Sequence, residues 1–183
     1  RAHLLPGCLL ALLVGVLLSA CAQADDGVRG RDVRMDGNAF HVVSINLERS
    51  HLTLHWRDPA SRRAYESIAT LKPWGATRRQ SLLFAANAGI YAHNSKPLGL
   101  YVENGRTVVP LNTAHGNPSA GNFSLLPNGV FAIDDDGHAH VSTTLAFAKA
   151  NAHPRLATQS GPMLVIDGQI NAHFAADSGS VKW

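Results

Sequence analysis

The chain has 183 residues and a formal net charge of +3; 45% of its residues are hydrophobic and 16% are charged. This length allows one domain with a substantial core, and the composition is that of a globular protein, not a disordered one. The positive excess is too small to indicate nucleic-acid binding. Cysteine occurs only at Cys8 and Cys21. The rest of the chain therefore has no disulfide framework, thiol nucleophile or Cys-ligated metal.

Residues 1–20 have the pattern of a lipoprotein signal peptide. The apolar run 8–18 follows a short basic stretch and is shorter than the about 20 residues of a membrane-spanning helix. Leu-Ser-Ala-Cys at 18–21 resembles the bacterial lipobox, whose cysteine is lipidated and becomes the mature N-terminus. We expect lipidation of Cys21, a tether over residues 21–38 and a location in the bacterial envelope, anchored to the outer membrane and facing the periplasm. An ordinary signal peptide with an unmodified Cys21 is the alternative.

Between residues 40 and 86 the sequence predicts three strands and one helix. Segment 40–46 is rich in β-forming residues, and segment 51–56 alternates apolar and polar positions, so both are predicted as strands. Residues 60–71 predict a helix that ends before Pro73. The continuous apolar run 81–86 predicts a buried central strand.

Turn residues divide the second half of the chain. Asn-Gly or Asp-Gly pairs stand at 104–105, 128–129, 136–137 and 167–168, between apolar or alternating runs. Such pairs favour hairpins, because both central residues of a type I′ turn need positive φ. We therefore predict antiparallel hairpins over 98–111, 122–142 and 163–172, and a second helix over 144–150. The predicted fold class is α+β, a mixed, largely antiparallel β-sheet with several hairpins and a few helices.

Standard metal and nucleophile motifs are absent from the sequence. His51 and His55 would lie about 13 Å apart on a strand, too far to share a metal. His138 and His140 would lie about 7 Å apart on one strand face, and we interpret them as exposed positions beside the turn at 134–137. We predict no metal and no cofactor.

Small polar residues gather where predicted strands end. Asn87 and Gly89 directly follow the apolar run 81–86, Asn122 opens a later hairpin, and residues 158–162 read Thr-Gln-Ser-Gly-Pro. Loops at strand ends often carry sites, and uncharged amide and hydroxyl side chains hydrogen-bond sugar or phosphate oxygens. Turn formation explains each segment as well when it is taken alone.

Longer motifs resemble one protein family. They are Asn-Ala-Gly-Ile-Tyr at 87–91, Pro-Leu-Gly-Leu-Tyr-Val-Glu-Asn-Gly at 97–105, Pro-Leu-Asn at 110–112, Gly-Asn-Phe at 121–123, Pro-Asn-Gly-Val-Phe at 127–131 and Ala-Thr-Gln-Ser-Gly-Pro-Met-Leu-Val-Ile-Asp-Gly at 157–168. In this order they resemble the phosphodiester glycosidase family, with a domain over residues 39–183. The resemblance implies an α+β fold and a hydrolase that cleaves the glycosidic bond of a sugar-1-phosphodiester, such as that of N-acetylglucosamine.

The resemblance and the polar clusters together suggest roles for individual residues. The leaving phosphomonoester is a weak base, so the acid of the usual carboxylic pair would be dispensable. Residues expected to bind sugar and phosphate oxygens are Asn87, Gly89, Asn122, Thr158 and Gly161. Residues assigned to the catalytic centre are Gln159, Ser160 and, as the carboxylate that activates water, Asp177.

The family pattern would continue after Trp183 with an Arg-Asn-Gly-Val-Gly-like segment. Its arginine is a natural bidentate partner for the substrate phosphate. We therefore expect the domain to be incomplete at its C-terminus and inactive in this form. The alternative function is a non-catalytic envelope lipoprotein that binds glycans or cell-wall polymers with the same surface.

Overall fold

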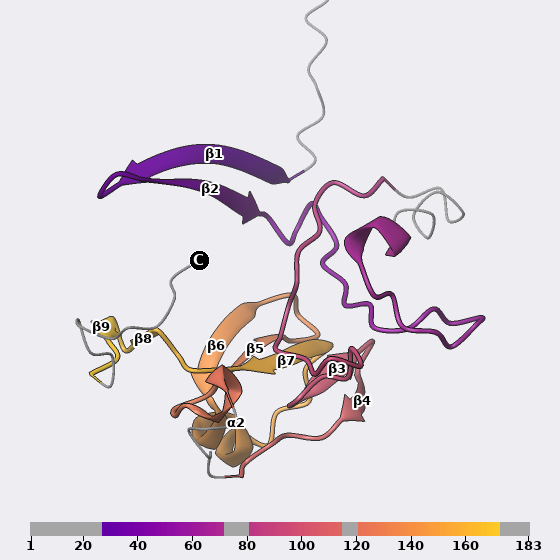
Figure 1. The fold of residues 1–183 in the computed structure, drawn as a ribbon. Coiled ribbons are helices and arrows are strands. Elements are labelled where there is room, and N and C mark those ends of the chain that lie inside the picture. Colours follow the sequence, from indigo (N-terminus) through magenta and orange to yellow (C-terminus); the bar gives the residue numbers. More distant parts are fainter. Residues whose placement is uncertain (1–26, 72–80, 115–120, 173–183) are drawn as a thin grey trace, which may run out of the picture.

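The computed structural model describes residues 27–71, 81–114 and 121–172. Cys21, Asp177 and the predicted signal peptide lie outside these residues. A five-stranded antiparallel sheet with the strand order β4-β3-β7-β5-β6 forms the centre of the fold (Figure 1). Its strands are β3 (Tyr101–Glu103), β4 (Arg106–Val109), β5 (Gly129–Ile133), β6 (Ala139–Thr143) and β7 (Leu156–Ser160). This architecture confirms the predicted α+β class.

Three of the four predicted turns form hairpins. Asn104 and Gly105 have φ of 52° and 72° between β3 and β4, and Asp167 and Gly168 have φ of 49° and 77° between β8 (Val165–Ile166) and β9 (Gln169–Ile170). The β5–β6 turn places only Gly137 at positive φ, 87°. Both residues of the first two pairs, and the glycine of the third, therefore supply the left-handed backbone that tight hairpins need.

The fourth pair, Asn128-Gly129, does not form a turn between strands. Asn128 is buried, and its Nδ2 donates to the carbonyl oxygen of Phe123 in a 3-10 helix over Asn122–Ser124. Gly129 then begins β5. The hairpin predicted over 122–142 is wrong in its first part, because this asparagine uses its side chain to hold the 3-10 helix.

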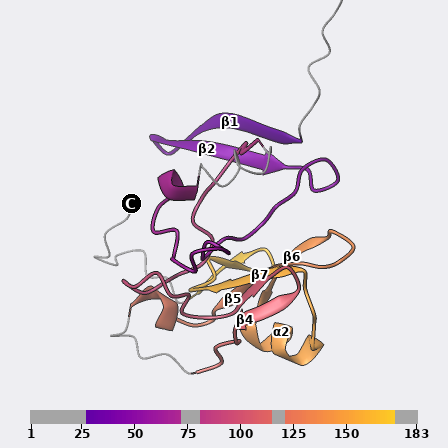
Figure 2. The same cartoon turned by 90° about the vertical axis from the view of Figure 1, so that its right-hand side faces the viewer.

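A separate hairpin lies before the sheet in sequence and stands apart from it (Figures 1 and 2). It comprises β1 (Val28–Met35) and β2 (Asn38–Ile45), joined by Asp36 and Gly37 with φ of 51° and 77°. The strand predicted over 40–46 is confirmed as part of β2. Residues 28–35, which we placed in the tether, form its partner strand.

The predicted second helix is confirmed as α2 (Thr144–Ala150). The side chain of Thr143 accepts a hydrogen bond from the Ala146 N–H, and the left-handed Asn151 ends the helix. Phe147 of α2 packs into the core on one side of the sheet. The buried members of this core are Leu100, Val102, Val130, Ala132, Phe147 and Ala157.

Three predicted elements before the sheet are wrong in whole or in part. Residues 51–56 belong to no strand, and of the helix predicted over 60–71 only 68–71 are helical. Asp58 explains the second error: its Oδ1 accepts from the N–H of Ala60, at 3.1 Å, and of Ser61, at 2.6 Å, which favours a local turn over a helix. Segment 81–86 is neither a strand nor buried. Phe84, for example, is 43% exposed.

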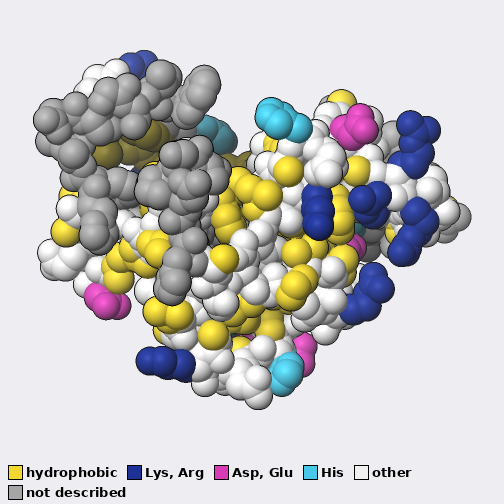
Figure 3. All heavy atoms as spheres, turned by 60° about the horizontal axis from the view of Figure 1, so that its bottom comes forward, with side chains coloured by type: hydrophobic (Ala, Val, Ile, Leu, Met, Phe, Trp, Pro, Cys, Tyr) yellow, Lys and Arg dark blue, Asp and Glu magenta, His cyan; other side chains and the backbone are white. Residues whose placement is uncertain are grey.

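The surface of the described chain carries apolar side chains. Figure 3 shows them across the middle of one face, with Lys and Arg side chains gathered toward one side. Leu145 of α2 is 65% exposed and Ile170 of β9 is 78% exposed. Among the described residues, no helix is long and apolar enough to cross a membrane.

Candidate functional site

The centre of the site is β7, which pairs with β3 on one side and with β5 on the other. Alternate side chains of a strand point to opposite faces of its sheet. Thr158 and Ser160 therefore lie on one face, while Ala157 and Gln159 lie on the face covered by α2. The predicted motif 158–161 thus places its hydroxyls and its amide on different sides.

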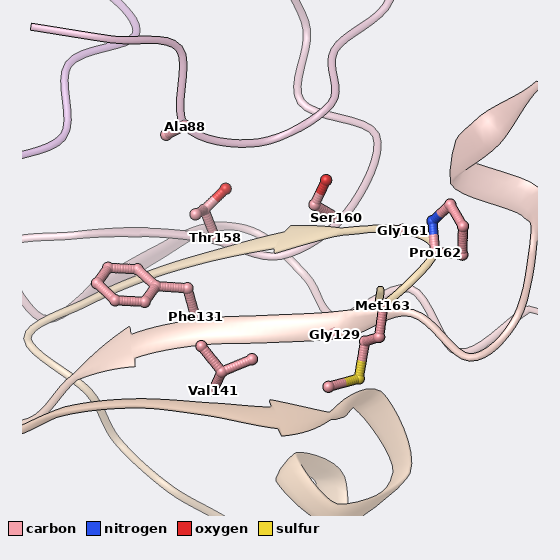
Figure 4. Close-up of a pocket in the computed structure, with 9 residues that line it drawn as sticks. All are labelled: Ala88, Gly129, Phe131, Val141, Thr158, Ser160, Gly161, Pro162 and Met163. Carbon is pink, nitrogen blue, oxygen red and sulfur yellow. The ribbon is translucent and has the colours of Figure 1, made fainter. Parts of the chain in front are cut away.

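A pocket of about 180 Å³ opens on the face with Thr158 and Ser160. Both side chains point toward the segment that carries Ala88 (Figure 4). Phe131, Val141 and Met163 supply apolar surface from neighbouring elements. The described residues that line the pocket are Ala88, Gly129, Phe131, Val141, Thr158, Ser160, Gly161, Pro162 and Met163.

The loop with Gly89 lies directly against β7. A Cβ atom at residue 89 would overlap Thr158 Oγ1 and lie 2.9 Å from the carbonyl oxygen of Gln159. Only glycine allows this approach without a shift of the backbone. The structure therefore brings together the two segments predicted to share a site, 87–89 and 158–161. Asn87 itself is exposed and does not line the pocket.

Gln159 has a structural position that corrects the catalytic role we predicted for it. Its side chain is 1% exposed, and its Oε1 accepts from the N–H of Leu100, at 2.9 Å, and of Asn112, at 3.0 Å. Its Nε2 donates to the carbonyl oxygen of Asn112, at 2.8 Å, and to Thr144 Oγ1, at 3.0 Å. These bonds use the hydrogen-bonding capacity of the amide. Gln159 joins β7 to three other segments and does not face the pocket.

Asn122 and Gly161 differ in their relation to the pocket. Gly161 lines it, and a Cβ atom at this residue would overlap Asn128 Nδ2. Asn122 is exposed at the start of the 3-10 helix and does not line it. Phe131 and Met163 also line the pocket and were not predicted, although both stand in the matching motifs, because polarity was the signal for a site residue.

Comparison with known proteins places this site in a family. The sequence model of the phosphodiester glycosidase family matches residues 80–182, which is more than half of the chain. The chain belongs to the phosphodiester glycosidase family. The resemblance seen in the sequence is thereby confirmed.

One relative is the uncharacterized protein YigE of Escherichia coli K12. It is 33% identical over 166 residues, which cover 91% of this chain and 61% of YigE. The chain thus spans less than two thirds of the length of this curated relative. No solved structure matches the chain.

The lining of the pocket, as far as the structure describes it, contains no charged side chain. Tyr101 pairs with Thr158 across β3 and β7, and burial raises the pKa of its hydroxyl. Burial also raises the pKa of Glu103 on the same strand, with Arg106 acting in the opposite direction. Asp177 lies outside the described residues, so its role as the water-activating carboxylate stays a prediction.

One cluster of possible metal ligands occurs among the described residues of the phosphodiester glycosidase domain, outside the pocket. Ligand atoms of Asp134, Asp136 and His138 lie within 4.8 Å of one another. Asp134 Oδ1 accepts from the His138 N–H at 2.8 Å, and this bond lowers the pKa of Asp134. The contact closes the β5–β6 turn, which explains the cluster as turn structure. His140 is not a member of the cluster.

Proposed function

We propose that the protein is a hydrolase that cleaves the glycosidic bond of a sugar-1-phosphodiester, N-acetylglucosamine-1-phosphodiester being the model substrate. The observation that carries this proposal is the pocket itself, within the residues matched by the family model. Thr158 and Ser160 offer two hydroxyls beside the apolar surface of Phe131. Sugars combine hydroxyl groups with apolar C–H faces, so this mixed lining suits a sugar ring.

The charge of the lining decides how the substrate would be oriented. Among the described residues, neither Lys nor Arg lines the pocket, so a phosphate group there would lose hydration without a cation from these residues to compensate. The neutral sugar therefore occupies the pocket, and the phosphate lies at its rim.

The proposed reaction adds water at the anomeric carbon. The bond from C1 to the phosphate oxygen breaks, its electron pair stays on that oxygen, and a phosphomonoester leaves. Ser160 and Thr158 hold the sugar by hydrogen bonds, while Asp177 takes the proton of the attacking water. Because the leaving group is a weak base, a strong general acid is unnecessary. We place the enzyme in the bacterial envelope, lipid-anchored through Cys21 to the outer membrane on its periplasmic side.

The test is release of free sugar from N-acetylglucosamine-1-phosphodiesters by the full-length protein. Ser160→Ala is expected to lower kcat/KM by about 100-fold, the loss typical of one transition-state hydrogen bond. Ser142→Ala is the matched control, because Ser142 lies on the opposite sheet face and its Oγ is buried without a hydrogen-bond partner. The control is expected to keep the wild-type rate.

Two results would overturn the proposal. One is the absence of sugar release above the Ser160→Ala level across several sugar phosphodiesters. The other is cleavage of the wrong bond: in ¹⁸O-labelled water, glycosidic cleavage leaves the released phosphomonoester unlabelled, whereas a phosphodiesterase puts the label into its phosphate.

A non-catalytic glycan-binding lipoprotein is the second candidate. The uncharged lining of the described pocket favours it, since binding needs no general base. It predicts saturable sugar binding, reduced by Ser160→Ala, without any turnover.

A further inference from the structure

The two faces of the β1–β2 hairpin differ in composition. The strand register places Arg31 opposite Val42 and Val33 opposite Phe40, so these four residues share one face. We call it the Arg31 face. Its members are Arg29, Arg31, Val33, Met35, Asn38, Phe40, Val42 and Ser44. It combines arginine with apolar residues and contains no acidic residue.

The opposite face carries an aspartate in contact with a histidine. Asp32 lies across from His41, and Asp32 Oδ1 is 2.7 Å from His41 Nδ1. Arg34 lies on this face as well, across from Ala39. We call it the Arg34 face. Because Arg34 shares the face with the Asp32 carboxylate, this face attracts anions less than the Arg31 face does.

The Arg31 face exposes large apolar side chains. Met35 is 59% exposed and Phe40 is 46% exposed. The hairpin stands apart from the five-stranded sheet in both views (Figures 1 and 2), and it lies outside the residues that the family model matches. An isolated two-stranded hairpin is marginally stable in water, so a further surface against it would be stabilising.

The position of the hairpin in the chain favours one such surface. Only residues 22–27 separate Cys21 from β1, a stretch that reaches at most about 25 Å when fully extended. Lipidation of Cys21 would therefore hold the hairpin close to the lipid headgroups. Arginine binds phosphate groups, and exposed aromatic and Met side chains suit the boundary between headgroups and acyl chains.

We propose that the Arg31 face lies on an anionic phospholipid surface and orients the domain on the membrane. The hairpin is then a second attachment, independent of the acyl chains and of the reaction in the pocket. It fixes which side of the domain faces the bilayer, which a lipidated terminus alone does not.

The test compares variants of the chain from residue 21 onward, without the apolar signal segment, in which Cys21→Ala removes the lipidation site. Binding is measured by sedimentation with phosphatidylcholine vesicles containing 30% phosphatidylglycerol and with pure phosphatidylcholine vesicles. Arg31→Ser is expected to weaken binding to the anionic vesicles about fivefold, the effect of one arginine at a charged surface. Arg34→Ser removes the same charge from the other face and is the matched control. Phe40→Ser is expected to weaken binding without changing its dependence on salt.

The proposal is supported if Arg31→Ser weakens binding to the anionic vesicles more than Arg34→Ser does, provided that both variants keep the wild-type circular dichroism. An equal loss of vesicle binding in the two variants would overturn the proposal, because it would indicate attraction by the overall positive charge and not by one face. Equal binding of the parent chain to both vesicle types would also overturn it. Light scattering tests whether a second copy of the chain covers the Arg31 face instead. If the parent chain is a dimer and Phe40→Ser makes it a monomer, the proposal is overturned.

Discussion

Replacement of Gln159 by leucine tests the structural role of this residue. Leucine keeps most of the side-chain volume but loses all four hydrogen bonds of the amide. The N–H groups of Leu100 and Asn112 would then lack their acceptor, and each unsatisfied buried donor costs about 1–3 kcal/mol. The two donors together predict a loss of about 2–6 kcal/mol in the free energy of unfolding, a large part of the stability of a domain.

Urea denaturation followed by far-UV circular dichroism measures this loss. With a slope of about 2 kcal/mol per molar urea, a loss of about 4 kcal/mol lowers the midpoint by about 2 M. Ser160→Ala, at the adjacent residue, is the control and is expected to change stability by less than about 1 kcal/mol. A double-mutant cycle with Thr144→Val should show a coupling energy of about 0.5–3 kcal/mol, because a hydrogen bond joins the side chains of Gln159 and Thr144. A loss below about 1 kcal/mol in Gln159→Leu, or no coupling with Thr144, would refute the reasoning.

Two further predictions concern the site loop and pH. Gly89→Ala is expected to lower kcat/KM for sugar release about 100-fold, because the new Cβ pushes the loop away from Thr158. Gly37→Ala strains the β1–β2 turn, since Gly37 has φ of 77°, but its Cβ meets nothing within 4 Å and it lies outside the pocket lining, so this variant should leave kcat/KM unchanged. Equal rates for the two variants would contradict the close contact as the cause. Burial raises the pKa of Glu103 above its ordinary value of 4.5, so the folded state holds this proton more tightly than the unfolded state. The stability tied to this group is present below pH 4.5 and is lost as pH rises through the folded-state pKa. Glu103→Gln should therefore raise Tm at pH 7 but not at pH 4, and an equal rise at both values would show that the charge is not the cause.

The sequence predicted those elements whose structure depends on a few adjacent residues. Asn104-Gly105 and Asp167-Gly168 form turns because their backbone adopts positive φ at low cost, whatever the rest of the chain does. The helix α2 begins after the Thr143 cap and ends at a left-handed asparagine. The same signal at Asp36-Gly37 was available and would have predicted the β1–β2 hairpin.

Elements that depend on distant partners could not be predicted in this way. An apolar run such as 81–86 is a central strand only when other strands pair with it, and the described structure places none there. The site shows the same limit. The motif 158–161 lies on a strand that lines the pocket, but the alternation that turns Gln159 away from Ser160 becomes informative only once β7 is placed in the sheet.

The place of β7 in the sheet also determines when the sheet can be completed during synthesis. The hairpins β3–β4 and β5–β6 join neighbours in the chain, so each can close as soon as its own residues are available. They are connected in the sheet only by β7, the last of the five strands in the chain. Pairing of β3 with β7 joins residues more than 50 positions apart and carries a larger entropic cost of loop closure. The ribosome must therefore release Thr158 and Ser160 before the two halves of the sheet can join, so assembly of the sheet and creation of the pocket are one late event.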